Sequence, residues 1–368
     1  YQADALVQVE AKQSNSLLKN LTPFGSELSP DVAPELLLLK SRMILGETVD
    51  QLGLTYNARR RVFPVIGSLW EHVRGRKSDE ITIGALTIPL LEGKPQTLLL
   101  TVQEKGRYRL EGKTLQAEGT VGKALVKDGM SLLVTSLSAV PGTQFTLETV
   151  TRLDAINAIQ NRFTVVESAK QSGMIALTLM GEDPTRIATV LNTIAENFLS
   201  QNIARQEAKD SRSLTFLQEQ LPKISRELDE AEARLNAYRE QRDSVDLSLE
   251  AKSVLDQVVN VENQLNELTF REAEVSQLFK KDHPTYRALR EKKQTLERER
   301  ARLNNRVSTM PSTQQEILRL SRDVESGRTI YLQLLTRQQE LSISRSSTIG
   351  NVRIIDPAVV QPEPIKPR

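Results

Sequence analysis

The sequence contains no cysteine and only two histidines, His72 and His283, among its 368 residues. The absence of thiols excludes a cysteine nucleophile and cysteine metal sites. It also fits an oxidising compartment in which the fold needs no disulfide framework. Two histidines without neighbouring ligands exclude a histidine-rich metal centre. We therefore expect no metal site, no catalytic centre and no resident cofactor in this chain.

A large net charge and long apolar runs are also missing. The 49 basic and 47 acidic residues leave a net charge of +2, which argues against nucleic acid as the main partner because phosphate backbones require a strongly positive surface. No run of about eighteen apolar residues occurs, so we expect no segment of this chain to cross a bilayer. No signal peptide is recognisable. The sequence opens inside a strand-like pattern and closes on a proline-rich tail, so we expect both ends to continue into a longer protein.

The most informative feature that is present is a heptad pattern of apolar residues in the second half. Alternating spacings of three and four keep a narrow apolar stripe on one face of a helix. The stripe residues are Leu214, Leu217, Leu221, Ile224, Leu228, Ala231, Leu235 and Tyr238; Val254, Val258, Val261, Leu265, Leu268 and Val275; Leu289, Leu296, Leu303 and Val307; and Ile317, Leu320, Val324, Tyr331, Leu334 and Leu341. Glu272, Lys293 and Arg300 interrupt these stripes. Partner helices can come from the same chain or from another chain.

Breaks between the stripes indicate how the helices connect. Residues Ser244–Leu249, His283-Pro284 and Met310-Pro311 interrupt the pattern, and a residue before proline is disfavoured in a helix. These breaks favour antiparallel hairpins within one chain for most of the area. Asp183-Pro184 opens the first long helix, in which Pro222 predicts a kink or a break near Leu221.

The first half mixes strand and helix patterns. Residues Tyr1–Glu10 predict a strand, Pro34–Leu52 predicts one helix that Gly53 ends, and a short helix is expected around Trp70. Short β runs separated by glycine turns predict an antiparallel β module at Ile81–Ala85, Leu98–Val102, Tyr108–Leu110, Met130–Val134 and Phe145–Val150. A helix at Leu153–Phe163 and strands at Ile175–Leu179 and Val352–Ile355, the last closed by Asp356-Pro357, are also expected.

These patterns predict an α+β chain in five consecutive parts. The parts are residues 1–79, a mixed α/β segment; 80–150, a β-rich insertion; 151–183, a return to the α/β part; 184–345, a long-helix coiled-coil region; and 346–368, a closing strand with a proline-rich tail.

The sequence contains no recognisable catalytic motif, because phosphate-binding glycine loops, dinucleotide-binding motifs and nucleophilic-serine motifs are all missing. The most specific charge feature is a cationic helix. Its basic residues are Arg287, Arg290, Lys292, Lys293, Arg298, Arg300, Arg302 and Arg306. One interpretation is a contact surface for an acidic glycan or a neighbouring subunit; the other is a solvated or ion-paired helix face. Arg59-Arg60-Arg61 is interpreted as an exposed loop, with anionic lipid headgroups as the alternative partner.

Several segments resemble the polysaccharide co-polymerase family, and specifically its Wzc/Etk branch of tyrosine autokinases. The resemblance covers essentially the whole chain. The matching segments are Tyr1–Val7, Ser41–Gly46, Gln264–Thr269, His283–Tyr286, Thr313–Glu316, Asp323–Gly327 and Val352–Ala358.

The resemblance implies a membrane-proximal periplasmic domain between two inner-membrane helices, which lie outside this sequence, as does a cytoplasmic kinase that uses ATP and Mg. It further implies a ring-shaped homo-oligomer that regulates capsular or exopolysaccharide polymerisation, chain length and export. The implied partners are an outer-membrane export channel and the polysaccharide polymerase with its glycan. If both chain ends return to one membrane, Leu6–Val9 and Val352–Ile355 are expected in one sheet. The alternatives are a periplasmic adaptor of an efflux or secretion system and a glycan-processing enzyme.

Overall fold

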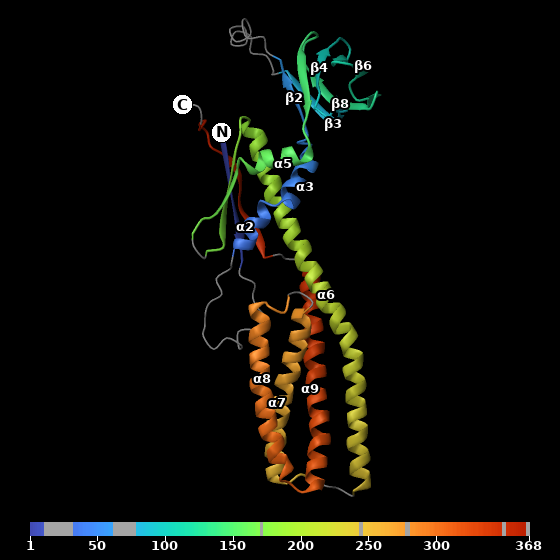
Figure 1. The fold of residues 1–368 in the computed structure, drawn as a ribbon, viewed down its shortest axis with the longest axis vertical. Coiled ribbons are helices and arrows are strands. Elements are labelled where there is room, and N and C mark those ends of the chain that lie inside the picture. Colours follow the sequence, from blue (N-terminus) through green and yellow to red (C-terminus); the bar gives the residue numbers. More distant parts are fainter. Residues whose placement is uncertain are drawn as a thin grey trace. The chain divides into compact units, whose positions relative to one another are not determined.

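The computed structural model of the protein describes residues 1–10, 32–61, 79–169, 172–242, 246–276, 280–347 and 351–365. It divides into two compact units, one formed by Tyr1–Gln201 with Asn351–Arg368 and the other by Asn202–Gly350 (Figure 1). Helix α6, Pro184–Gln241, contributes residues to both units. The predicted α+β fold class is confirmed, since both strands and long helices are abundant.

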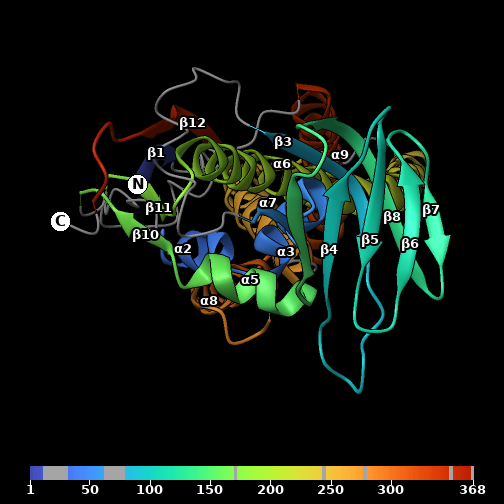
Figure 2. The ribbon, with the colours of Figure 1, turned by 90° about the horizontal axis from the view of Figure 1, so that it is seen from above.

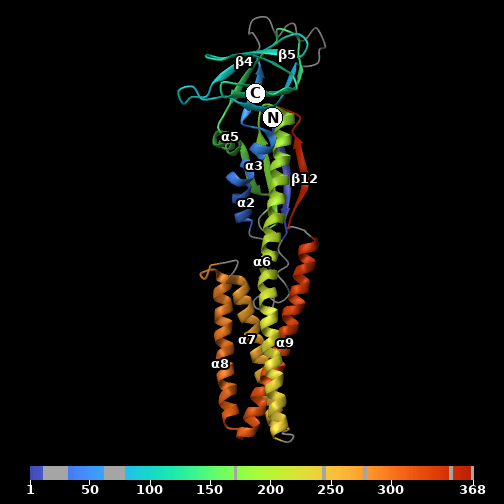
Figure 3. The ribbon, with the colours of Figure 1, turned by 90° about the vertical axis from the view of Figure 1, so that its right-hand side faces the viewer.

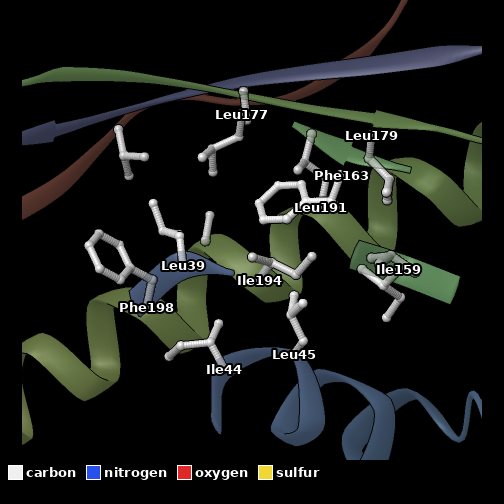
Figure 4. Close-up of a cluster of buried hydrophobic side chains, with 14 of the residues drawn as sticks. Leu39, Ile44, Leu45, Ile159, Phe163, Leu177, Leu179, Leu191, Ile194 and Phe198 are labelled. Carbon is white, nitrogen blue, oxygen red and sulfur yellow. The ribbon is translucent and has the colours of Figure 1, made fainter. Parts of the chain in front are cut away.

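A four-stranded antiparallel sheet organises the first unit. Its strand order is β10 (Phe163–Glu167), β11 (Met174–Met180), β1 (Gln2–Val9) and β12 (Val352–Val360). Along β1 every second side chain is buried, because successive residues of a strand point to opposite faces. The buried face packs on helices, where residues such as Leu39, Leu45, Phe163 and Leu177 form one core (Figure 4).

The first and last strands pair directly, as predicted. Val7 lies opposite Ile354 and Val9 opposite Val352 in the antiparallel register. The expected end of β12 at Asp356-Pro357 is wrong, because the strand continues to Val360. Proline is tolerated here because β12 is an edge strand with an irregular register at this point. The next amide hydrogen, on Ala358, bonds to Asn192 Oδ1 of α6 at 2.7 Å.

Three short helices and the first turns of α6 cover the sheet. They are α2 (Ala33–Leu39), α3 (Arg42–Leu52) and α5 (Arg152–Gln160), and Figure 3 shows them on the side opposite β12. The single helix predicted over Pro34–Leu52 is therefore wrong. Ser41 starts a new helix, since its hydroxyl accepts a hydrogen bond from the Ile44 amide at 3.3 Å. Gly53 ends α3 in the left-handed conformation, as predicted. The helix expected around Trp70 lies outside the described residues.

The β module has two sheets around a shared core. The larger has the order β2 (Tyr56–Arg60), β9 (Gln144–Thr149), β4 (Thr97–Val102), β5 (Arg107–Glu111) and β6 (Gln116–Thr120). The smaller has the order β3 (Glu80–Thr87), β8 (Met130–Ser138) and β7 (Leu125–Lys127). Figure 2 shows these strands side by side, and their inward side chains form one cluster.

Sequence patterns missed four strands, namely β2, β6, β7 and β10. The helix expected over Leu153–Phe163 ends at Gln160, and Phe163 instead begins β10. Arg59 and Arg60 belong to β2, which pairs with β9, so the interpretation of this segment as a loop is wrong, although both side chains are exposed as expected. Arg60 forms an ion pair with Asp79 at 3.1 Å, while Arg59 stays exposed.

The second unit is a helical bundle. It contains α6 from Asn202 onward, α7 (Leu249–Ser276), α8 (Pro284–Ser308) and α9 (Ser312–Ser347), which alternate in direction. The heptad residues pack against each other in three clusters: α7 with α8 and α9, and α6 with α9 at two levels. The hairpin prediction is confirmed. Helix α6 continues through Pro222, so a break there is wrong; the proline is exposed.

Candidate functional site

Helix α8 carries the cationic surface predicted from the sequence. His283 caps its N-terminus, because Nδ1 accepts a hydrogen bond from the Thr285 amide at 3.3 Å, and Pro284 occupies the first turn. Tyr286, Leu289 and Leu303 are buried and fix which side of the helix faces the bundle. Because the orientation of α8 is fixed, some of the eight basic residues face the other helices of the bundle and the others face outward.

Four of the eight basic residues are engaged within the chain. Lys293 Nζ lies 3.3 Å from Glu272 Oε2, and Arg300 lies 3.7 Å from Glu262 Oε1, both on α7. Arg302 pairs with Glu299 on its own helix, and these hydrogen bonds lower the pKa of Glu299 and raise that of Arg302. Arg290 stacks over the Tyr286 ring with its guanidinium carbon 5.6 Å from the ring centroid.

The other four basic residues form the outward part of this surface. Among the described residues, Arg287, Lys292, Arg298 and Arg306 have no ion-pair partner, and the three arginines are exposed. Glu291 and Glu297 are the exposed acidic residues of the same helix. The helix thus keeps an excess of unneutralised positive charge toward solvent. Such a field favours an anionic partner and is screened by salt.

A polar cleft of about 630 Å³ opens in the middle of the bundle and receives side chains from all four helices. Arg300 of α8 lines it, together with Arg234 of α6 and Arg322 of α9. Beside it, Ser326 donates a hydrogen bond to Asn263 Oδ1 at 3.2 Å. The cleft is open and mixed in charge, unlike the largely apolar pockets that hold small ligands.

A second feature lies where the two chain ends meet. The Gln361 amide donates to the Gln2 carbonyl at 2.9 Å, and the Tyr1 backbone nitrogen donates to the Gly181 carbonyl at 2.8 Å. Asp4 ties these strands together: Oδ1 accepts from Thr178 Oγ1 at 3.1 Å and Oδ2 accepts from Gln361 Nε2 at 2.8 Å. Sequence reasoning found the strand pair but not Asp4, although an acidic residue within an alternating strand is the signal that could have marked it.

Chemical machinery is not evident in the described part of the chain. There, no three histidine or acidic side chains are placed to hold a metal ion, and no helix is long and apolar enough for a membrane crossing. His283 serves as a helix cap, as the turn interpretation predicted, and His72 lies outside the described residues. What the geometry offers is a scaffold: a sheet that holds both chain ends, with a helical bundle and a β module inserted between them.

This class of scaffold agrees with the family models that match the chain. Residues 56–150 match the N-terminal domain of the tyrosine-protein kinase Wzc, and residues 312–368 match the G-rich domain GNVR. The first match covers the β module from β2 to β9. The second covers α9 and β12, and so includes the strand that pairs with β1.

Similarity to whole proteins identifies the branch. The chain is 61% identical over 368 residues to the tyrosine-protein kinase etk of Escherichia coli K12 and 47% identical over 370 residues to the tyrosine-protein kinase wzc of Salmonella typhimurium. EpsB of Ralstonia solanacearum is 35% identical over 392 residues. Each alignment covers all of this chain but only 51–52% of the relative, so the chain spans about half the length of these relatives. Over its whole length the chain is similar to Wzc/Etk-type proteins, and the match to the Wzc N-terminal domain indicates that it resembles their N-terminal region.

Proposed function

We propose that this chain is the periplasmic, oligomer-forming region of an inner-membrane tyrosine autokinase and acts as a polysaccharide co-polymerase. In this role it sets the polymerisation, chain length and export of a capsular polysaccharide or exopolysaccharide. The region itself performs no chemistry; ATP and Mg belong to the kinase region of the longer relatives. An outer-membrane export channel and the polysaccharide polymerase with its growing glycan are the proposed partners.

The observation that carries this proposal is the hydrogen bond between the Gln361 amide and the Gln2 carbonyl. Two strands from opposite ends of the sequence are adjacent and antiparallel, so the start of β1 and the end of β12 lie side by side at the same end of the sheet. A domain inserted between two helices of one membrane needs this arrangement. The comparisons support the co-polymerase interpretation over the periplasmic adaptor, because the matching proteins are Wzc, Etk and EpsB.

Contact of α8 with an acidic glycan or with a neighbouring subunit is part of the proposal. The exposed arginines Arg287, Arg298 and Arg306 would attract either kind of acidic surface while Lys293 and Arg300 hold α8 on the bundle. Exposed cations mainly raise the rate at which a charged partner associates. Because salt screens this attraction, the association rate should fall as ionic strength rises.

Complementation tests this function: the full-length protein is expressed in a strain from which its own gene has been deleted. The strain should then regain surface polysaccharide with a normal length distribution, measured by gel electrophoresis. Alkaline phosphatase inserted between Gly93 and Lys94, in an exposed turn, should be active, because this enzyme folds only outside the cytoplasm. A matched insertion in the kinase region should be inactive. Normal polymer export by a protein that stays monomeric in native membranes would refute the proposal, as would an inactive periplasmic reporter.

A further inference from the structure

Helices α6 and α8 each carry a second regular face that points away from the bundle. On α6 the exposed residues at alternating spacings of four and three are Glu219, Lys223, Arg226, Glu230, Ala233 and Ala237, of which Glu230 also borders the cleft of the bundle. On α8 the exposed residues with the same spacing are Arg287, Glu291, Gln294, Arg298, Ala301 and Asn305. We call these the α6 outer stripe and the α8 outer stripe. Each lies opposite the buried stripe of its own helix, and this spacing is the one that lets two helices pack along a common seam.

The two outer stripes lie at matching heights. Both helices run toward the end of the bundle where α7 and α9 begin, so they are parallel. Leu235 of α6 packs in the cluster of Ile317, and Leu303 of α8 packs in the cluster of its neighbour Leu318. Residues separated by about 68 positions therefore lie at similar heights, to within about one helical turn of 5.4 Å.

At this separation of 68 positions the charges of the two stripes are complementary. Glu219 is level with Arg287, Lys223 with Glu291, and Glu230 with Arg298. The level pair Ala233 and Ala301 places two small side chains where two helices could approach closely. None of these six charged residues has an ion-pair partner among the described residues of its own chain.

We propose that the α6 outer stripe of one copy packs, in parallel and in this register, against the α8 outer stripe of the next copy. The proposal rests on the proposed oligomeric function and identifies the contact that builds the oligomer. The two surfaces differ, so the contact is heterologous and repeats from copy to copy, as closure into a ring requires.

Ion pairs between exposed residues contribute little affinity each, so the charges mainly select the register and exclude wrong neighbours. The rest of the affinity would come from avidity, because each copy in the oligomer makes this contact with two neighbouring copies at once. This contact also gives Arg287 and Arg298 a protein partner rather than a glycan, while Arg306 stays outside the stripe.

Disulfide cross-linking tests the register, because the chain has no cysteine of its own. The full-length protein, with any cysteines elsewhere replaced by serine, would carry Ala233→Cys and Ala301→Cys together. Mild oxidation in native membranes should give a ladder of covalent oligomers. The control combines Ala233→Cys with Gln294→Cys, which moves one thiol by seven residues, or about 10 Å, beyond disulfide reach.

Charge reversal tests the complementarity. Arg287→Glu with Arg298→Glu in the Ala233→Cys, Ala301→Cys background should lower the ladder yield about tenfold, because like charges then face each other. Adding Glu219→Arg and Glu230→Arg should restore it. Arg306→Glu with Arg345→Glu changes the net charge equally at exposed positions off both stripes and should leave the yield unchanged.

The outcomes separate this inference from the proposed function. Native mass spectrometry that finds an oligomer, together with no ladder or equal ladders from both cysteine pairs, would overturn the contact and leave the function standing. A monomer by mass spectrometry would refute both. Failure of the four-residue charge swap to restore the ladder, in a protein whose circular dichroism is unchanged, would also overturn the contact and favour glycan as the partner of these arginines.

Discussion

Lys293 Nζ on α8 lies 3.3 Å from Glu272 Oε2 on α7, and the Tyr286 hydroxyl donates to the other oxygen of this carboxylate at 3.3 Å. Both charged side chains are about 30% exposed, so water screens the pair only in part. These two residues had interrupted the apolar stripes in the sequence. In the bundle they form an ion pair with each other. This contact fixes the register of the α7–α8 hairpin.

Reversing either charge of this pair should destabilise the bundle. Glu272→Lys or Lys293→Glu alone should lower the free energy of unfolding by about 1–2 kcal/mol, because each places like charges in a half-buried site. The variant with both changes should recover about half of that loss, although the Tyr286 hydrogen bond is not rebuilt. Chemical denaturation followed by circular dichroism measures all four proteins.

The exposed pair Glu299–Arg302 is the matched control for this cycle. Both of its side chains are on α8 and are more than 40% exposed, so their coupling should stay below about 0.5 kcal/mol. Equal coupling energies for the two pairs would contradict the claim that Glu272–Lys293 fixes the hairpin.

Tyr108 of β5 is fully buried, and its hydroxyl has no hydrogen-bond partner. Its ring packs against Gly119 of β6, where a larger residue would collide with it. Burial raises the pKa of Tyr108 because the phenolate is disfavoured away from water. Tyr108→Phe should therefore keep or increase stability, by up to about 1–2 kcal/mol, since an unsatisfied buried polar group is removed.

Tyr56→Phe provides the contrast in the same module. The Tyr56 hydroxyl donates to the carbonyls of Ile83 and Gly84 at 3.3 and 3.2 Å, which links β2 to β3. Its loss should cost about 0.5–1.5 kcal/mol. Thermal unfolding of both variants decides the matter: a lower melting temperature for Tyr108→Phe than for Tyr56→Phe would contradict this assignment.

The helical bundle could be predicted from the sequence because its determinants are local. The apolar spacing, His283-Pro284 and Met310-Pro311 together specify where α7, α8 and α9 begin and end. The pairing of β1 with β12 followed from a different argument, namely where the two chain ends must go. The α8 arginines could be recognised as a cationic helix, but only packing shows that Lys293 and Arg300 face α7 while Arg287 and Arg298 face outward.

Short strands were missed where tertiary contacts override local preference. Strand β6, Gln116–Thr120, has weak β formers and gains its structure from pairing with β5. Strand β2 contains Arg59 and Arg60, whose charges suggested a loop, yet its backbone completes the sheet beside β9. The break at Ser41 between α2 and α3 carried a usable signal, because serine before a helical run is a preferred N-cap.

A buried polar contact joins α6 to α3 in the core of the first unit. Asn197 Nδ2 donates to Thr48 Oγ1 at 3.0 Å, and the Thr48 hydroxyl donates to the Ile44 carbonyl at 3.0 Å. Thr48→Val should lower the free energy of unfolding by about 1–3 kcal/mol, because the Asn197 amide is left unpaired in a dry site. Thr48→Val with Asn197→Leu should recover part of this loss. Equal stability of the wild type and Thr48→Val by chemical denaturation would show that the amide finds another partner.

Stability should depend on acid through the Asp50–Arg152 contact between α3 and α5. Arg152 Nε donates to Asp50 Oδ1 and its second nitrogen donates to Oδ2, both at 2.9 Å. These hydrogen bonds lower the pKa of Asp50 below its ordinary value, because they favour the charged carboxylate. The contact therefore stabilises the fold above the unfolded-state pKa of about 3.9, and this contribution is lost as pH falls through the lower folded-state pKa.

Arg152→Gln should remove that pH dependence. The difference in unfolding free energy between wild type and variant should be constant near pH 6 and shrink as the pH drops below about 4. An NMR titration of the Asp50 carboxyl should show its pKa rising in Arg152→Gln and rising less in Arg152→Lys, which keeps the charge but loses the paired hydrogen bonds. The same Asp50 pKa in all three proteins would mean that the contact does not persist in solution and that α3 and α5 are held together by their buried apolar faces alone.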